Sequence, residues 1–175
     1  DYAKASGIIE PVIGKKLKGY RSPAWEFSRN TLDILENMGI EYSSNMMGTD
    51  RLEPLEIFGR KSNIIEIPIH WILDDAAFWL YSVRIAGKCM QPLSAVEDCW
   101  IKEFDGLYEE FMEEEENGID SDIVFVLTCH PQVIGRPSRM TVLENVIRHI
   151  NSCPNVEFVT AGQAVASYKE RHGLK

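Results

Sequence analysis

The chain has 175 residues, of which 45% are hydrophobic and 26% are charged, and its formal net charge is −9 at pH 7. This length suits a single domain over residues 1–175, with enough apolar residues to build a buried core. The negative charge argues against broad nucleic-acid binding, which requires lysine and arginine for the phosphates. Since no apolar run reaches the length of a membrane span, we expect neither a nucleic-acid nor a membrane partner.

The chain contains four cysteines, whose spacing matches no zinc motif: Cys89, Cys99, Cys129 and Cys153. We interpret all four as free thiols in a reducing compartment, and therefore expect a cytoplasmic protein. Cys129 stands within an apolar run, where it is expected to be a small buried hydrophobe.

The first half of the chain alternates helical and extended patterns. A short helix is predicted over residues 1–16 and a second over 29–38, with Ser28 as its N-cap and Gly39 as its stop. Strands are predicted over four apolar runs, at residues 17–21, 40–45, 55–58 and 64–69. A turn is expected at residues 59–61, between the last two strands.

The second half continues the alternation. A short helix is expected over residues 74–82, and Ser94 is expected to cap a long helix that ends near residue 112, before the acidic run at 113–116. The continuous run at 122–129 is typical of a strand buried on both faces. The remaining predicted elements are a helix over 140–152 capped by Ser138, with Leu143, Val146, Ile147 and Ile150 facing inward, a strand at 156–159, and a helix from Thr160 to about residue 172.

Strands that alternate with helices predict an α/β fold with a mainly parallel sheet. Active sites of such folds lie at the C-terminal ends of the strands. The first strand end carries Arg21, a permanent cation with five hydrogen-bond donors. The alternative for Arg21 is a surface arginine that pairs with a carboxylate.

Two further strand ends carry groups suited to proton transfer. Asp74 and Asp75 follow the strand at 64–69 and could hold an imidazole, although Asp74 could also cap a short helix, which is the commoner role of aspartate before one. His130 follows the run at 122–129 and could move protons near neutral pH, or be a satisfied core histidine. His70, beside Trp71, is interpreted as structural. No histidine pair has metal-ligand spacing, so no metal site is predicted.

These segments resemble the later motifs of the polysaccharide deacetylase family. Arg-Ser-Pro-Ala-Trp at 21–25 resembles its third motif, Trp-Ile-Leu-Asp-Asp at 71–75 its fourth, and Leu-Thr-Cys-His-Pro at 127–131 its fifth. The stretches at 43–51 and 130–147 resemble the allantoinase-like and cyclic-imidase-like subgroup. The resemblance covers residues 19–168 and implies the C-terminal portion of a distorted (β/α) barrel.

The resemblance also implies a function, the hydrolysis of non-peptide carbon–nitrogen amide bonds. The substrate would be an N-acetylated sugar or a small cyclic amide or imide. In this family a divalent metal, often zinc, polarises the amide carbonyl and its water. Its ligands belong to earlier motifs, and no histidine precedes Arg21. We therefore expect the metal-binding part to be missing, and this chain alone to be inactive.

The resemblance assigns roles to matching residues. Arg21 would orient the catalytic base, His130 would protonate the leaving nitrogen, and Asp74 or Asp75 would hold the imidazole. Pro23, Trp25, Trp71 and Leu127 would line the substrate pocket, and Trp25 stands where many members have glycine. The alternatives are a non-catalytic binding module, or an incomplete fragment that pairs with its own N-terminal half or another copy.

Overall fold

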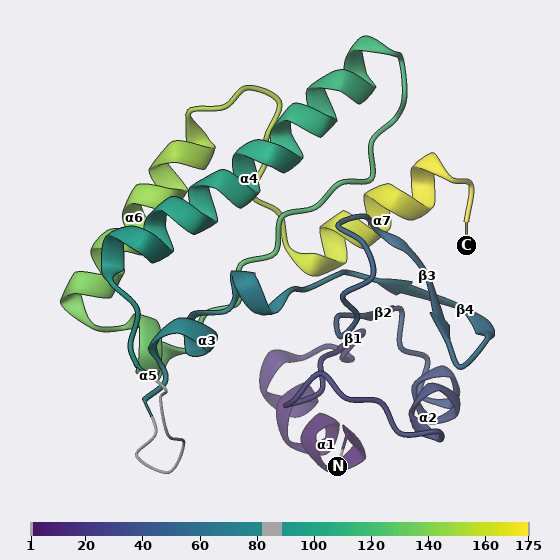
Figure 1. The fold of residues 1–175 in the computed structure, drawn as a ribbon. Coiled ribbons are helices and arrows are strands. Elements are labelled where there is room, and N and C mark those ends of the chain that lie inside the picture. Colours follow the sequence, from purple (N-terminus) through teal and green to yellow (C-terminus); the bar gives the residue numbers. More distant parts are fainter. Residues whose placement is uncertain (1, 82–88, 175) are drawn as a thin grey trace. The chain divides into compact units, whose positions relative to one another are not determined.

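The computed structural model describes residues 2–81 and 89–174 (Figure 1). The chain divides into two compact units. The first comprises Asp1–Met46, Arg51–Pro68 and Val159–Lys175, and the second comprises Met47–Asp50 and Ile69–Phe158. Each unit has a hydrophobic cluster of its own.

The first unit contains a four-stranded sheet in the order β1-β2-β4-β3. The parallel strands are β1 (Gly19–Tyr20), β2 (Tyr42–Ser43) and β4 (Arg60–Glu66), while β3 (Glu53–Ile57) runs antiparallel to β4. The expected α/β class with a mainly parallel sheet is confirmed. Two of the predicted strands shrink to two residues each, because β1 and β2 form few ladder pairs.

A tight hairpin joins β3 to β4. Phe58 and Gly59 both have positive φ values, 52° and 74°, as the two-residue turn that matches strand twist requires. The predicted turn at 59–61 lies one residue too late, since β4 already begins at Arg60.

Three helices belong to the first unit: α1 (Tyr2–Ile13), α2 (Thr31–Asn37) and α7 (Ala161–Arg171). The predicted Thr160 cap is confirmed as a capping box with Gln163. The predicted Ser28 cap is wrong, because the Ser28 hydroxyl pairs with the Thr31 side chain at 2.8 Å and Asn30 is the N-cap of α2.

The second unit is built on two long helices that lie side by side (Figure 1), α4 (Leu93–Glu116) and α6 (Pro137–Asn151). Its core includes residues that recur at helical spacing: Val96, Trp100 and Phe104 from α4, and Val142, Val146 and Ile150 from α6. Trp79 and Trp100 pack edge to face, with ring centroids 5.5 Å apart.

The predicted boundaries of α4 and α6 need correction. Ser94 and Ser138 are not caps but lie in the first helical turns, because prolines set the starts: Pro92 is the N-cap of α4, and Pro137 is the first residue of α6. The acidic run also continues α4 to Glu116 instead of following it. Ile147 was expected inside but is 38% exposed.

Two predicted strands are absent from the described residues. Residues 122–129 are extended and half-buried, with a parallel bridge between Thr128 and Asp74 instead of a continuous ladder. Residues 156–159 form no ladder either, and Phe158 is 60% exposed. Apolar β-branched residues favour an extended backbone, but a strand also requires a neighbour in register.

The second unit also holds η1 (Trp71–Leu73), α3 (Asp75–Trp79) and α5 (Pro131–Ile134). The expected short helix at 74–82 is thus found as α3, while Ser82 lies outside the described residues. Within residues 2–81 and 89–174, no helix combines the length and apolar character that crossing a bilayer requires.

Candidate active site

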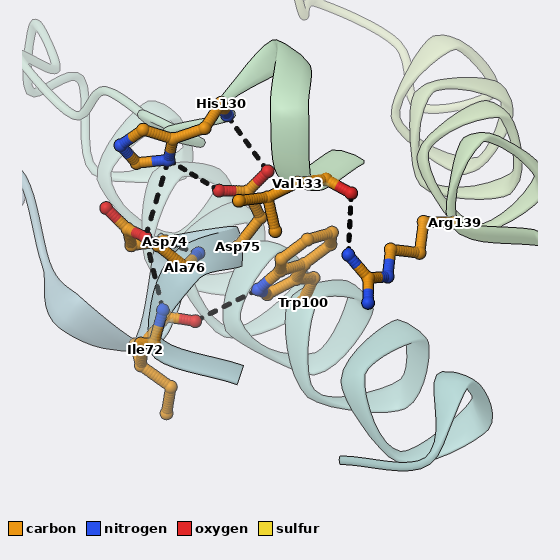
Figure 2. A network of polar contacts seen from close by, with 9 residues as sticks. Ile72, Asp74, Asp75, Ala76, Trp100, His130, Val133 and Arg139 are labelled. Atoms are coloured by element: carbon orange, nitrogen blue, oxygen red, sulfur yellow. Dashed lines mark hydrogen bonds and ion pairs between the residues drawn. The ribbon is translucent and has the colours of Figure 1, made fainter. Parts of the chain in front are cut away.

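His130 and Asp75 form a close pair in the second unit (Figure 2). The ring Nδ1 of His130 lies 2.6 Å from Oδ1 of Asp75, and the His130 backbone amide donates to Oδ2 at 2.9 Å. The Asp75 side chain is fully buried, whereas 38% of the His130 side chain is exposed. The carboxylate therefore fixes both the ring and the backbone of a histidine that remains accessible.

Local backbone pairing explains why residues 55 positions apart meet. The Thr128 amide donates to the Leu73 carbonyl at 2.7 Å, and the Asp75 amide donates to the Thr128 carbonyl at 3.1 Å. These bonds align two extended segments in parallel, so that both exits reach the same edge. His130 then caps α5 while Asp75 opens α3.

Asp74 has a different task from its neighbour. Its Oδ1 accepts hydrogen bonds from the Ala76 and Ala77 amides at 2.6 and 3.3 Å, which makes it the N-cap of α3. The distance from the same oxygen to His130 Nδ1 is 3.9 Å. Of the two carboxylates that the sequence leaves open, Asp75 contacts the imidazole and Asp74 holds the helix start.

A packed tryptophan supports this helix start. The indole N–H of Trp100 donates to the Ile72 carbonyl at 3.0 Å, and its side chain is fully buried (Figure 2). His70 accepts the Ile72 amide at 3.2 Å and caps η1, which agrees with its structural interpretation. Arg139, from α6, donates to the carbonyl of Val133 in α5 at 2.8 Å.

Burial also controls the thiol next to His130. Burial, together with the nearby carboxylates of Asp75 and Asp74, raises the pKa of Cys129 to about 12. The thiolate is therefore disfavoured at neutral pH, and Cys129 is no nucleophile. All four cysteines are free thiols, as predicted.

Donor atoms of Asp74, Asp75 and His130 lie within 4.8 Å of one another, close enough for a shared metal ion. The sequence indicates these three residues as catalytic candidates but not as metal ligands, because carboxylates 55 and 56 positions before His130 have no recognisable metal-ligand spacing. Hydrogen bonds within the protein already use several of these atoms. Both Asp75 oxygens bind His130, and Asp74 Oδ1 accepts two backbone amides. These hydrogen bonds hold the imidazole in one orientation, as an acid–base pair requires.

The other predicted site residues lie in several places. Trp71 is 51% exposed, and Leu127 packs against the core of the second unit. Arg21, Pro23 and Trp25 belong to the first unit, so their convergence with His130 stays a prediction.

Trp25 has an unusual backbone. Its φ is +57°, a left-handed conformation that favours glycine and costs a bulky residue free energy. This explains in physical terms why glycine suits the position.

A buried polar network in the first unit was not identified from sequence. It joins Arg21 and Ser22 to buried side chains at the ends of neighbouring strands, namely Ser43, Ser44, Asn45 and Glu66. Short polar residues at strand ends were the available signal, and composition alone does not separate them from loop residues.

The second unit thus presents an accessible histidine whose ring is oriented by a buried aspartate, an arrangement suited to proton transfer. Comparisons with known proteins add information on the fold and the family. No protein-family model matches the chain. It is 27% identical to a peptidoglycan deacetylase of Helicobacter pylori, over 98% of this chain and 64% of that protein.

Solved structures agree on the fold. A putative polysaccharide deacetylase from Mycobacterium smegmatis matches with a TM-score of 0.78 at 24% identity, over 99% of this chain and 56% of that one. Puue allantoinase matches with a TM-score of 0.76 at 20% identity, over 99% of this chain and 53% of that one. The resemblance to the polysaccharide deacetylase family is confirmed, with its barrel fold. The chain spans between half and two thirds of the proteins it matches.

Proposed function

We propose that the protein to which this chain belongs hydrolyses amide bonds, with an N-acetyl group on a glycan as its substrate. The observation that carries the proposal is the His130–Asp75 pair, with an accessible imidazole at the C-terminal end of an extended segment. The similarity to a peptidoglycan deacetylase supports the choice of substrate class.

In this mechanism His130 is the general acid. Because its Nδ1 faces Asp75, the remaining ring nitrogen, Nε2, is left to give a proton to the reacting group. Water adds to the amide carbonyl, the C–N bond breaks, and the proton from Nε2 goes to the leaving nitrogen. The products are acetate and a free amine. Asp75 keeps the ring oriented and stabilises its charged form.

Arg21 would orient the base that activates the water. It lies at the exit of a parallel strand in the first unit, which is where such a residue belongs. We place the family's divalent metal, zinc by resemblance, on ligands from the family's earlier motifs, which precede the motif of Arg21, and leave His130 and Asp75 as the acid–base pair. Purified chain 1–175 should accordingly lose zinc on mild chelation, as metal analysis would show.

The test is acetate release from an N-acetylated glycan by the longest natural form of the protein. His130→Ala should lower kcat by about 10²–10⁴-fold, the usual contribution of a positioned acid. His149→Ala is a matched control, since His149 Nε2 also lies 2.6 Å from an aspartate, Asp105, but on the long helices. A His130→Ala variant that is folded and keeps wild-type kcat would refute the assignment.

A small cyclic amide is the second candidate substrate, favoured by the shared fold with an allantoinase. The same enzyme preparation distinguishes the two substrates, because ring opening yields one carboxylate product and releases no acetate.

The compartment depends on the substrate. The four free thiols support the cytoplasm. A substrate in the cell wall would instead require the protein to act outside the cytoplasm.

A further inference from the structure

The parallel strands of the first unit end in one row. Tyr20 of β1 pairs with Ser43 of β2, and Ser43 pairs with Glu66 of β4. The residues that follow these strands therefore emerge at the same edge of the sheet. Arg21 is the first residue past β1, and Ser44 and Asn45 are the first two past β2.

Asn45 binds both peptide groups that flank Arg21. Its side-chain Oδ1 accepts the Ser22 amide at 2.7 Å, and its Nδ2 donates to the Tyr20 carbonyl at 3.3 Å. The Asn45 side chain is almost fully buried, with 2% of the residue exposed. One carboxamide thus restrains the backbone immediately before and after Arg21, while Ser44 Oγ accepts the Arg21 guanidinium at 2.7 Å.

Glu66 in turn holds Asn45. Its Oε1 accepts the Asn45 and Met46 amides at 2.5 and 2.8 Å, and the residue is 2% exposed. Its second oxygen, Oε2, is buried and makes no hydrogen bond among the described residues. Burying a carboxyl group with one unpaired oxygen costs free energy of folding. A residue whose only role was to close this loop would be expected to avoid that cost.

The strands themselves are too short to place Arg21. β1 and β2 contain two residues each, so the ladder offers few backbone bonds around the exit. We propose that Asn45 and Glu66 are positioning residues, which fix the Arg21 backbone through the chain of contacts from Glu66 to Asn45 to the peptide groups of Arg21. This proposal rests on the role of Arg21 in the proposed function.

A double-mutant cycle tests the route of action in the longest natural form of the protein. Asn45→Ala should lower kcat/KM by about 10–100-fold, the usual loss when support for an active residue is removed. In an Arg21→Ala background, adding Asn45→Ala should cause no further loss, because the residue acts through Arg21. If the two losses multiply, the positioning role is wrong.

Two substitutions of Glu66 test whether a conservative replacement keeps the activity that truncation removes. Glu66→Gln keeps an acceptor oxygen for the two amides and should stay within about threefold of wild type, whereas Glu66→Ala should lose about 10–100-fold. The exposed Asn63, on the same strand as Glu66, supplies the matched control, and Asn63→Ala should leave kcat/KM unchanged. Wild-type activity in folded Glu66→Ala overturns the proposal.

The two hydrogen bonds from the Asn45 side chain to the peptide groups beside Arg21 are called the Arg21 clamp below. Amide hydrogen exchange tests this clamp without an activity measurement. In Asn45→Ala, the Ser22 amide should exchange roughly tenfold faster, the value expected for one lost hydrogen bond. Should Asn45→Ala fail to fold, Asn45→Asp keeps the acceptor for Ser22 and loses the donor to Tyr20, so it should keep Ser22 protection yet lose activity. Unchanged Ser22 exchange in folded Asn45→Ala refutes the clamp. A wild-type protein that hydrolyses no amide, with faster Ser22 exchange in the variant, refutes the function and leaves the clamp standing.

Discussion

Asp75 binds His130 twice, through the ring Nδ1 at 2.6 Å and through the backbone amide at 2.9 Å. The two bonds use different oxygens of one fully buried carboxylate. The ring and the main chain of His130 are therefore aligned by the same group, and loss of its charge should affect the ring more than the backbone. This separation allows orientation to be tested apart from folding.

Asp75→Asn should keep the size of the side chain and lose its charge. An asparagine can still accept the His130 amide, so the fold should survive, but it no longer stabilises a charged imidazole. We expect kcat to fall by about 10–100-fold or more, with KM nearly unchanged. Nitrogen NMR of the His130 ring should show an altered tautomer. A change in KM alone would contradict an orienting role.

Thiol labelling should discriminate between two cysteines. The pKa of Cys129 is raised to about 12 by burial and by the carboxylates of Asp75 and Asp74, while Cys89 is exposed. At pH 8, iodoacetamide should therefore modify Cys89 in the native protein and spare Cys129. Peptide mass spectrometry measures both sites, and unfolding in urea should remove the difference. Rapid native labelling of Cys129 would show that its surroundings are more open than described.

The stability of the first unit should depend on the ionisation of Glu66. Burial raises its pKa, although the Asn45 and Met46 amides, the Ser43 hydroxyl and the Arg21 charge all favour the carboxylate. The folded state thus retains the proton to a higher pH than the unfolded chain does. The contribution of Glu66 to the free energy of unfolding is complete at pH values below its ordinary pKa of 4.5. It declines as the pH rises through the raised pKa of the folded state.

Glu66→Gln removes this titration and keeps the acceptor. The variant should therefore gain stability relative to wild type as the pH is raised from 4 to 7, in thermal melts across that range. A gap between the two proteins that shrinks with rising pH would reverse the sign and refute the raised pKa.

Adjacent residues of α6 should respond differently to truncation. Val146 is fully buried in the second core, whereas Ile147 is 38% exposed. Val146→Ala should lower the free energy of unfolding by about 1–3 kcal/mol, because it leaves a cavity. Ile147→Ala should cost less than about 1 kcal/mol, although it removes more atoms. Urea unfolding of both variants measures this, and equal losses would place Ile147 in the core.

The sequence predicted what depends on local pattern. Helical spacing located α4 and α6, and the Thr160 cap was found because its capping box lies within four residues. Local pattern was not enough where strand pairing decides the structure: the run at 122–129 has strand composition but forms isolated bridges, such as the one between Thr128 and Asp74, instead of a ladder. Likewise, the sequence placed Asp74, Asp75 and His130 among the candidates through strand-end logic and family resemblance. Asp74 and Asp75 are adjacent, so the register between their segment and the segment before His130 decides which carboxylate contacts the ring. No sequence pattern predicts this register.

The contacts of Asn45 and Glu66 around Arg21 also could not be predicted from local sequence. Asn45 and Glu66 resemble ordinary loop and strand residues in sequence, and only the shared row of strand ends makes them neighbours of Arg21. The starts of α4 and α6, by contrast, could have been predicted from sequence. Pro92 and Pro137 set these starts, which Ser94 and Ser138 were expected to set.

Asp75 is the first residue of α3, and Asp74 is the cap of the same helix. The carboxylate that aligns His130 therefore sits on a helix of five residues, and fraying of its first turn would carry the carboxylate away from the ring. Short helices open locally at lower free energy than the whole domain. On warming, proton delivery should consequently fail at a lower temperature than the one at which the domain melts, so that heat inactivation precedes loss of the fold and is reversed on cooling.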